Sequence, residues 1–259
     1  MKPLIRPALT SMTAFADLLY PPVCPICLNR LDNDDAVVCF RCRAHLVPQF
    51  EWQCPRCAAS GFGTGPLPER PCRLCPPSQA AYSGVLNVTG YDDKVATCIH
   101  GFKYQARLEL GRWMARMMVE RLEPSLARLG GRVRVITPVP LHWIRRRILR
   151  GFNQSLLLAR PLARVGQSTL DPHLLRRVRH TRRQARVPRE RRARNVRNAF
   201  QVRHPERVRD QGVLLVDDVV TSGETVGECA RVLREAGARE VWVACFARAG
   251  LGLPDEFQL

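Results

Sequence analysis

One stretch near the C-terminal end limits the fold of this chain more than any other: GVLLVDDVVTSGET, at residues 212–225. Its first half is a nearly continuous aliphatic run that is too short for a typical helix, so it predicts a strand buried on both faces of a parallel sheet. Two carboxylates, Asp217 and Asp218, follow at the carboxyl end of this strand. A turn of small residues then opens a helix that we expect over 224–235, before Gly237.

This arrangement predicts a phosphorylated ligand. In an open α/β sheet, ligands bind outside the carboxyl ends of the strands. A helix N-terminus adds N–H groups and the positive end of a dipole, which favour an anion. Acids beside such a phosphate cradle indicate a sugar phosphate. Two other interpretations stay open: a Walker B strand also ends in acids, although the chain has no GxxxxGK[ST] loop, and a strand-turn-helix can be purely structural.

The segment LLVDDVVTSGET closely resembles the 5-phosphoribosyl-1-pyrophosphate (PRPP) motif of type I phosphoribosyltransferases. The resemblance implies that Asp217 and Asp218 hydrogen-bond the ribose hydroxyls and are the catalytic residues. It also implies a loop that wraps the 5-phosphate, formed by Thr221, Ser222, Gly223, Glu224 and Thr225. These residue types suit the role, because glycine lets the backbone approach a ligand and the hydroxyls donate hydrogen bonds to phosphate oxygens.

Eight of the eleven cysteines form four CxxC pairs: Cys24/Cys27, Cys39/Cys42, Cys54/Cys57 and Cys72/Cys75. Two such knuckles supply the thiolates of a closed tetrahedral zinc site, so four knuckles predict two Zn²⁺ sites. We favour sequential over interleaved pairing. A disulfide framework is the alternative, which the lack of a recognisable secretory signal disfavours, and a redox role needs fewer pairs. The remaining cysteines fit small buried hydrophobes: Cys98, Cys229 and Cys245.

A net charge of +18 is the outlier in the composition of this 259-residue chain. It predicts an anionic partner such as nucleic acid, a polyphosphate or an acidic protein, and it carries no information about the fold. The N-terminal segment is a poor signal peptide because Pro7 and Asp17 interrupt it, and no run of 18 apolar residues occurs. We therefore expect a cytoplasmic protein without membrane insertion.

The middle of the chain predicts further α/β elements. Residues 81–91 indicate a β-hairpin, because Gly84 and Gly90 interrupt a strand-like run. Helical spacing of apolar residues indicates helices over 93–103, 108–122 and 153–165, and strands are expected over 133–139 and 240–247. Prolines at 138 and 140 end the first of these strands and stiffen the loop that follows.

The order of these features resembles the ComF family of competence-associated proteins. A double zinc ribbon is followed by FKY at 102–104, PVPL at 138–141, RGFNQ at 150–154 and the PRPP motif. The resemblance implies a type I phosphoribosyltransferase-like parallel sheet flanked by helices, preceded by a small cysteine-rich double zinc ribbon. We expect an N-terminal helical segment at 1–19, the double ribbon at 20–78 and the phosphoribosyltransferase-like domain at 79–259.

In type I phosphoribosyltransferases the loop after the first core strand binds pyrophosphate. By resemblance this loop comprises Pro138, Val139, Pro140, Leu141 and His142. The arginines at 145–147 lie nearby in the sequence to neutralise charge. Lys103 is a further candidate for the same anion, the alternative being a solvated lysine at a helix end. The resemblance also implies Mg²⁺, which neutralises the leaving pyrophosphate.

Residues 176–197 hold eleven arginines and a single acid, Glu190. Such a run is typically a solvated or disordered segment, and it falls where type I enzymes carry a mobile loop over the active site. Because the planar guanidinium suits phosphate contacts, we also expect the run to hold PRPP or to track the backbone of single-stranded DNA. The candidate anion-binding residues are Arg182, Arg183, Arg186, Arg189, Arg191 and Arg192.

Together these patterns predict a PRPP-binding, phosphoribosyltransferase-like protein that acts in DNA uptake and natural transformation. As an enzyme it would transfer the phosphoribosyl group to an acceptor that the sequence does not identify. The alternative is a non-catalytic protein that binds single-stranded DNA or docks a partner through its basic face and zinc ribbons. The expected partners are PRPP, single-stranded DNA, and a DNA-uptake helicase or another competence protein.

Overall fold

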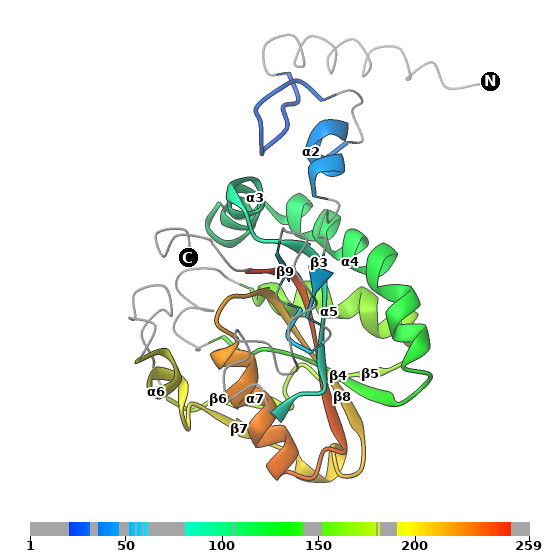
Figure 1. Cartoon of the computed structure of the whole chain (residues 1–259), viewed down its shortest axis with the longest axis vertical. Coiled ribbons are helices and arrows are strands. Elements are labelled where there is room, and N and C mark those ends of the chain that lie inside the picture. The colour runs from blue at the N-terminus through cyan, green and yellow to red at the C-terminus, as the bar shows by residue number, and fades with distance from the viewer. Residues whose placement is uncertain are drawn as a thin grey trace, which may run out of the picture. The chain divides into compact units, whose positions relative to one another are not determined.

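The computed structural model of the chain describes residues 21–31, 36–46, 52–54, 56–58, 60–61, 81–105, 107–141, 152–179, 181 and 191–249 (Figure 1). They group into two compact units, of which the first ends at His45 and the second begins at Leu46. The first contains helix α2 (Phe40–His45) and a turn closed by a bridge between Val23 and Arg30. The helical segment expected at 1–19 lies outside the described residues.

A five-stranded parallel sheet forms the centre of the second unit, with the strand order β3-β9-β8-β4-β5 (Figure 1). Its strands are β3 (Gly84–Gly90), β4 (Val133–Pro138), β5 (Thr169–Leu170), β8 (Gly212–Val220) and β9 (Glu240–Arg248). β8 is the central strand and is buried along most of its length. The aliphatic run forms this strand because a strand covered on both faces needs apolar side chains at successive positions.

Helices cover both faces of the sheet. On one face, α4 (Leu108–Arg128) packs against α5 (Gln154–Val165), while α7 (Glu224–Glu235) lies on the other face (Figure 1). Alternate residues of β8 serve the two faces: Val213 and Leu215 share a core cluster with Leu233 of α7, whereas Leu214 is fully buried outside that cluster. The expected class, an α/β fold with a parallel sheet flanked by helices, is confirmed.

The smaller elements of the second unit surround this sheet. An antiparallel pair joins β6 (Leu175–Arg177) to β7 (Phe200–Val202), and both α6 (Arg192–Val196) and β7 contact α7. The remaining elements are β1 (Trp52–Gln53), β2 (Ser60–Gly61), α3 (Asp93–Tyr104) and the 3₁₀ helix η5 (Pro205–Arg207). Within the described residues, no helix is both long enough and apolar enough to cross a membrane.

The hairpin expected at residues 81–91 is wrong. β3 is a single strand that pairs in parallel with β9. Gly84 does not form a turn. It lets the Trp242 ring pack closely against the backbone of β3, since a Cβ atom placed there would come within 2.5 Å of Cζ3 of Trp242. The other expected elements are present, and α4 continues beyond the expected end to Arg128 although Pro124 lies inside it. Buried Leu122 and Leu126 hold this last part of α4 to the core.

Candidate functional site

A cavity of about 170 Å³ lies at the carboxyl end of β8. The acid pair Asp217 and Asp218 lines it, together with residues 221–225, which run from the end of β8 into the first turn of α7 and which we call the phosphate loop. Residues 139–141, which follow β4, form another part of the wall. Parallel strands bring their carboxyl ends to one edge of the sheet, so these separate sequence segments meet in one place. Pro138 ends β4, and His142 lies outside the described residues.

The two acids of β8 have different partners. The hydroxyl of Ser155 and the backbone N–H of Asp218 each donate a hydrogen bond to Oδ1 of Asp217, both at 3.0 Å. Asp218 forms an ion pair with Lys103 of α3, with 2.9 Å between Nζ and Oδ1. Burial, and then the charge of Asp218, raise the pKa of Asp217 to about 7, although Lys103 partly opposes the shift. Asp217 therefore carries a proton part of the time near neutral pH.

Gly223 shapes the phosphate loop. It is the N-cap of α7 and has a φ of 81°, in the left-handed region that glycine adopts without steric cost. Its carbonyl oxygen accepts from the N–H of Gly227 at 2.7 Å, which starts the helix. Because glycine has no side-chain oxygen to cap the first turn of α7, the N–H groups there suit an anion.

The lining of the cavity also includes polar residues that the sequence did not assign to the site, among them Gln154, Ser155 and Arg177. The first two start α5, where the side chain of Asn153 accepts from the N–H of Ser155 at 3.1 Å. Asn153 is a recognisable N-cap, and this was the one local signal that a helix start would lie near the carboxyl ends of the strands. Arg177 comes from β6, and its guanidinium lies 5.1 Å from the centroid of the Phe200 ring.

The arginine-rich segment lies partly within the described residues. Arg182, Arg183, Arg186 and Arg189 are outside them, whereas Arg191 is exposed and Arg192 is buried. Arg179 is exposed, and its Nη2 donates to the carbonyl oxygens of Asn195 at 3.0 Å and Arg197 at 2.6 Å, next to the end of α6. Arg192 therefore differs from the solvated run that the composition suggested, because it is buried, and the exposed Arg179 bonds main-chain oxygens of the same segment.

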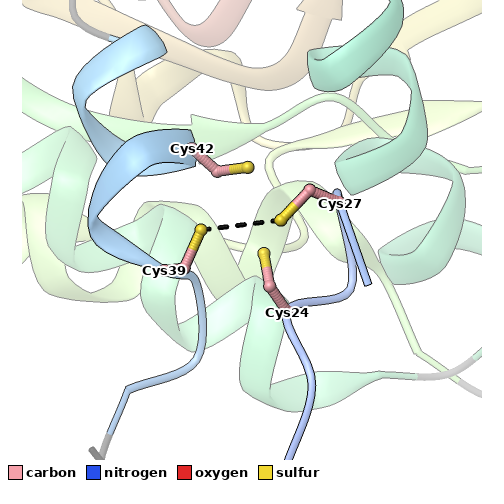
Figure 2. Close-up of side chains that lie close together, drawn as sticks. All are labelled: Cys24, Cys27, Cys39 and Cys42. Carbon is pink, nitrogen blue, oxygen red and sulfur yellow. Dashed lines mark hydrogen bonds between the residues drawn. The ribbon is translucent and has the colours of Figure 1, made fainter. Parts of the chain in front are cut away.

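Four cysteines of the first unit form a cluster, with their sulfur atoms all within 4.8 Å of one another: Cys24, Cys27, Cys39 and Cys42 (Figure 2). The sulfur atoms of Cys27 and Cys39 lie 3.6 Å apart. Zn–S bonds of about 2.3 Å in a tetrahedron place sulfurs about 3.8 Å apart, so the cluster fits a zinc ion. In the second unit Cys54 and Cys57 are buried, while Cys72 and Cys75 lie outside the described residues.

The thiols of this cluster are not equivalent. Burial opposes ionisation of Cys24, but the backbone N–H groups of Cys39, Cys27 and Ile26 outweigh it and lower the pKa of Cys24 to about 7. Burial and the neighbouring thiols raise the pKa of Cys42. The expected burial of the isolated cysteines is confirmed, since Cys98, Cys229 and Cys245 are all 0% exposed.

Comparison with known proteins gives a consistent result. Residues 154–256 match the phosphoribosyl transferase domain family. The DNA utilization protein YhgH of Salmonella typhi is 34% identical over 234 residues, which cover 89% of this chain and 99% of the relative. Competence protein F of Haemophilus influenzae is 29% identical over 180 residues, which cover 69% of this chain and 78% of that protein.

Among solved structures, a purine phosphoribosyltransferase from Pyrococcus horikoshii Ot3 matches over 55% of this chain and 80% of its own. Its sequence identity is 16%, and its TM-score is 0.34.

Proposed function

The chain belongs to the ComF family, and from that premise we propose that it binds PRPP in the cavity at the carboxyl end of β8 while acting in DNA uptake. The observation that carries this proposal is the convergence of the acid pair, the phosphate loop and residues 139–141 on one cavity. These segments come from different parts of the chain, and each offers the chemistry that one part of PRPP requires.

The roles follow from the chemistry of each group. The carboxylates of Asp217 and Asp218 accept hydrogen bonds from the ribose hydroxyls. The phosphate loop holds the 5-phosphate through its backbone N–H groups and hydroxyls. Residues 139–141 face the pyrophosphate, and Lys103 and Arg177, which line the same cavity, supply positive charge. Binding requires Lys103 to exchange part of its contact with Asp218 for the ligand, because the two side chains form an ion pair in the free protein.

Phosphoribosyl transfer is the finer function that this site supports. In that reaction the acceptor forms a bond to the anomeric carbon of the ribose while the bond to pyrophosphate breaks, and the protein contributes positioning and electrostatic stabilisation. Carboxylate oxygens suit Mg²⁺, which we expect to be held chiefly by the phosphates of the ligand, where it neutralises the leaving pyrophosphate. Pyrophosphate release in the presence of candidate acceptors measures this activity.

The test of PRPP binding is calorimetric titration of Mg-PRPP into the wild type and into the Asp217→Asn/Asp218→Asn variant. We expect the variant to bind at least about 100-fold more weakly, since hydrogen bonds to charged groups contribute about 1.5–3 kcal/mol each. Glu240→Gln is the matched control, because Glu240 is also a buried acid but lies at the opposite end of the sheet. Wild-type protein that fails to bind Mg-PRPP, or a double variant that binds like the wild type, would refute the proposal.

We further propose that the four-cysteine cluster holds a structural Zn²⁺ ion. Among the described residues of the first unit, Val38 is the one buried apolar residue besides the cysteines, so the metal would supply much of the folding free energy of this part. Metal analysis of the purified protein should give zinc, and Cys39→Ser should lower the zinc content. Unchanged zinc content in that variant would exclude this cluster as a metal site.

A second candidate function is binding of single-stranded DNA, favoured by the net charge of +18 and by exposed arginines on and beside α6. The double variant Arg191→Gln/Arg194→Gln should reduce the slope of log affinity against log salt by about 0.7 for each phosphate that an arginine no longer neutralises. Arg112→Gln/Arg116→Gln on α4 is the charge-matched control. An equal change in both variants would indicate unspecific attraction and remove the segment from the interface. A DNA-uptake helicase or another competence protein stays a predicted partner.

A further inference from the structure

Arg248 is a buried cation at the end of β9, beside the phosphate loop. Its side chain is only 2% exposed. Nε donates to the carbonyl oxygen of Cys57 at 2.7 Å, and Nη1 donates to the carbonyl oxygens of Val220, at 3.0 Å, and of Thr221. One guanidinium thus joins the last residue of β8, the first residue of the phosphate loop and a cysteine 191 residues away in the sequence.

The partners of this charge among the described residues are backbone carbonyl groups. Within the part of the chain that the structure describes, no carboxylate forms an ion pair with Arg248, and its hydrogen bonds all go to main-chain oxygens. Arginine does not lose its proton in proteins, and a buried charge without partners costs several kcal/mol. The carbonyl groups around Arg248 must therefore keep their positions, because any of them that moved would leave the cation with fewer partners.

The contact with Thr221 has a direct effect on the phosphate loop. In a trans peptide the C=O of one residue and the N–H of the next point in opposite directions. When Arg248 holds the carbonyl oxygens of Val220 and Thr221 toward itself, it turns the N–H groups of Thr221 and Ser222 away. Both residues line the cavity, so the guanidinium fixes the orientation of the peptide groups at the start of the loop.

We propose that Arg248 is a positioning residue of the phosphate loop, and that through it the Cys54/Cys57 knuckle controls how tightly the loop holds a phosphate. This inference rests on the proposed PRPP function. The knuckle is a firm anchor, because both cysteines are buried and the N–H of Ala58 donates to the carbonyl oxygen of Cys54 at 2.9 Å. A change in the knuckle displaces the carbonyl oxygen of Cys57. Arg248 then loses a hydrogen bond and holds the peptide groups of the phosphate loop less firmly.

Two variants of Arg248 test the positioning role. Arg248→Met removes charge and hydrogen bonds, whereas Arg248→Lys keeps the charge without the planar fork. We expect Mg-PRPP affinity, measured by calorimetry, to fall about tenfold or more in Arg248→Met, which corresponds to at least one charge-assisted hydrogen bond. Arg248→Lys should recover only part of it. Arg132→Met is the matched control, because Arg132 bonds the buried Glu240 at the far end of the sheet, and it should bind PRPP normally.

Amide hydrogen exchange of residues 220–226 gives a readout that needs no ligand. Exchange in this segment should accelerate in Arg248→Met and in Arg248→Lys but not in Arg132→Met. If the wild type fails to bind Mg-PRPP while this pattern appears, the proposed function fails and the positioning role stands. Wild-type affinity and wild-type exchange in Arg248→Lys, or in a folded Arg248→Met, would overturn the inference.

The role of the knuckle is tested by Cys54→Ser compared with Cys39→Ser in the other cysteine cluster. We expect Cys54→Ser to weaken Mg-PRPP binding severalfold and Cys39→Ser to leave it unchanged. In the Arg248→Lys background the effect of Cys54→Ser should shrink, since residues that act through one network have non-additive effects. If Cys54→Ser and Cys39→Ser changed Mg-PRPP affinity equally, or if the effects of Cys54→Ser and Arg248→Lys were fully additive, the knuckle would not act on the phosphate loop.

Discussion

The two ends of the parallel sheet each hold an acid, Glu240 at the amino end and Asp217 at the carboxyl end, and the surroundings of the two acids shift their pKa in opposite directions. At the amino end, Glu240 accepts a two-pronged hydrogen bond from Arg132 and another, at 2.9 Å, from the indole N–H of Trp242. Burial opposes ionisation of Glu240, yet these donors outweigh it and lower the pKa of Glu240. The protein itself therefore supplies the hydrogen-bond donors that the carboxylate of Glu240 needs.

At the carboxyl end, the direct donors to Asp217 among the described residues are one hydroxyl and one backbone N–H, and Asp218 lies beside it. Burial and that neighbouring charge raise the pKa of Asp217. An acid with few hydrogen-bond donors around it can accept hydrogen bonds from the hydroxyl groups of a ligand. An acid whose oxygens already have a full set of donors can only stabilise the fold. The contrast predicts variants with opposite effects on stability and binding.

The largest expected effect comes from the glycines near the two ends of β8. A Cβ atom at Gly212 would overlap the carbonyl oxygen of Arg132, a backbone atom that cannot move aside. We expect Gly212→Ala to destabilise the protein by about 3 kcal/mol or more. Gly223→Ala should cost about 1–2 kcal/mol for its left-handed φ and, unlike Gly212→Ala, should weaken Mg-PRPP binding.

Urea unfolding and calorimetry measure these two quantities. A Gly223→Ala variant that binds Mg-PRPP like the wild type would place the loop backbone outside the binding site. A Gly212→Ala variant as stable as the wild type would show that the amino end of the sheet tolerates expansion, and the contrast between the ends would then rest on the acids alone.

The next effect is that replacing the two acids should change the stability of the protein in opposite directions. Glu240→Gln should destabilise the protein by about 1.5–3 kcal/mol, because it removes hydrogen bonds to a charged group, and Mg-PRPP binding should be unchanged. Asp217→Asn keeps an oxygen to accept from Ser155 but removes the costly charge, so we expect a gain of at least about 1.4 kcal/mol near pH 7, the equivalent of one unit of the raised pKa, together with weaker binding. Destabilisation by both variants in urea would contradict the contrast.

Much of the carboxyl end could be predicted from local sequence. The helix expected over 224–235 agrees with α7, and residues 212–225 contain both the acids and the phosphate loop in one stretch. The amino end had no such signal, because the partners Arg132 and Glu240 are 108 residues apart and neither belongs to a motif.

The errors and omissions have the same physical origin. Gly84 looked like a turn residue because the Trp242 ring that requires it comes from another strand. Ser155, Arg177 and Arg248 gain their roles from segments that only the tertiary fold brings together, and a sequence pattern carries no information about such contacts until the order of the strands is known.

A smaller effect is a pH dependence of opposite sign at the two ends. The pKa of Asp217 is raised from 3.8 to about 7, so between these values the folded protein holds a proton that the unfolded chain has released. The contribution of Asp217 to stability therefore falls as pH rises through this window, by up to about 1.4 kcal/mol per pH unit. The advantage of Asp217→Asn in urea should grow from pH 4 to about 7 and then level off.

Glu240 provides the opposite trend in the same measurement. Its pKa is lowered from 4.5, so its contribution is fully present above this value and is lost as pH falls through the lower value of the folded state. The cost of Glu240→Gln should thus disappear in acid. Two difference curves of the same sign would contradict the assignment of the acids.

The smallest expected effect concerns Lys103, the cation that forms an ion pair with Asp218 at the carboxyl end of the sheet. Its charge lowers the pKa of Asp217 against burial and Asp218. In a Lys103→Met background, the pH at which the advantage of Asp217→Asn levels off should move upward, by up to roughly one unit. Arg132→Met, which removes the cation at the amino end, should leave this pH unchanged. If Lys103→Met also left it unchanged, Lys103 would act on Asp218 alone, and the raised pKa of Asp217 would follow from burial and its carboxylate neighbour without any tuning by the cation.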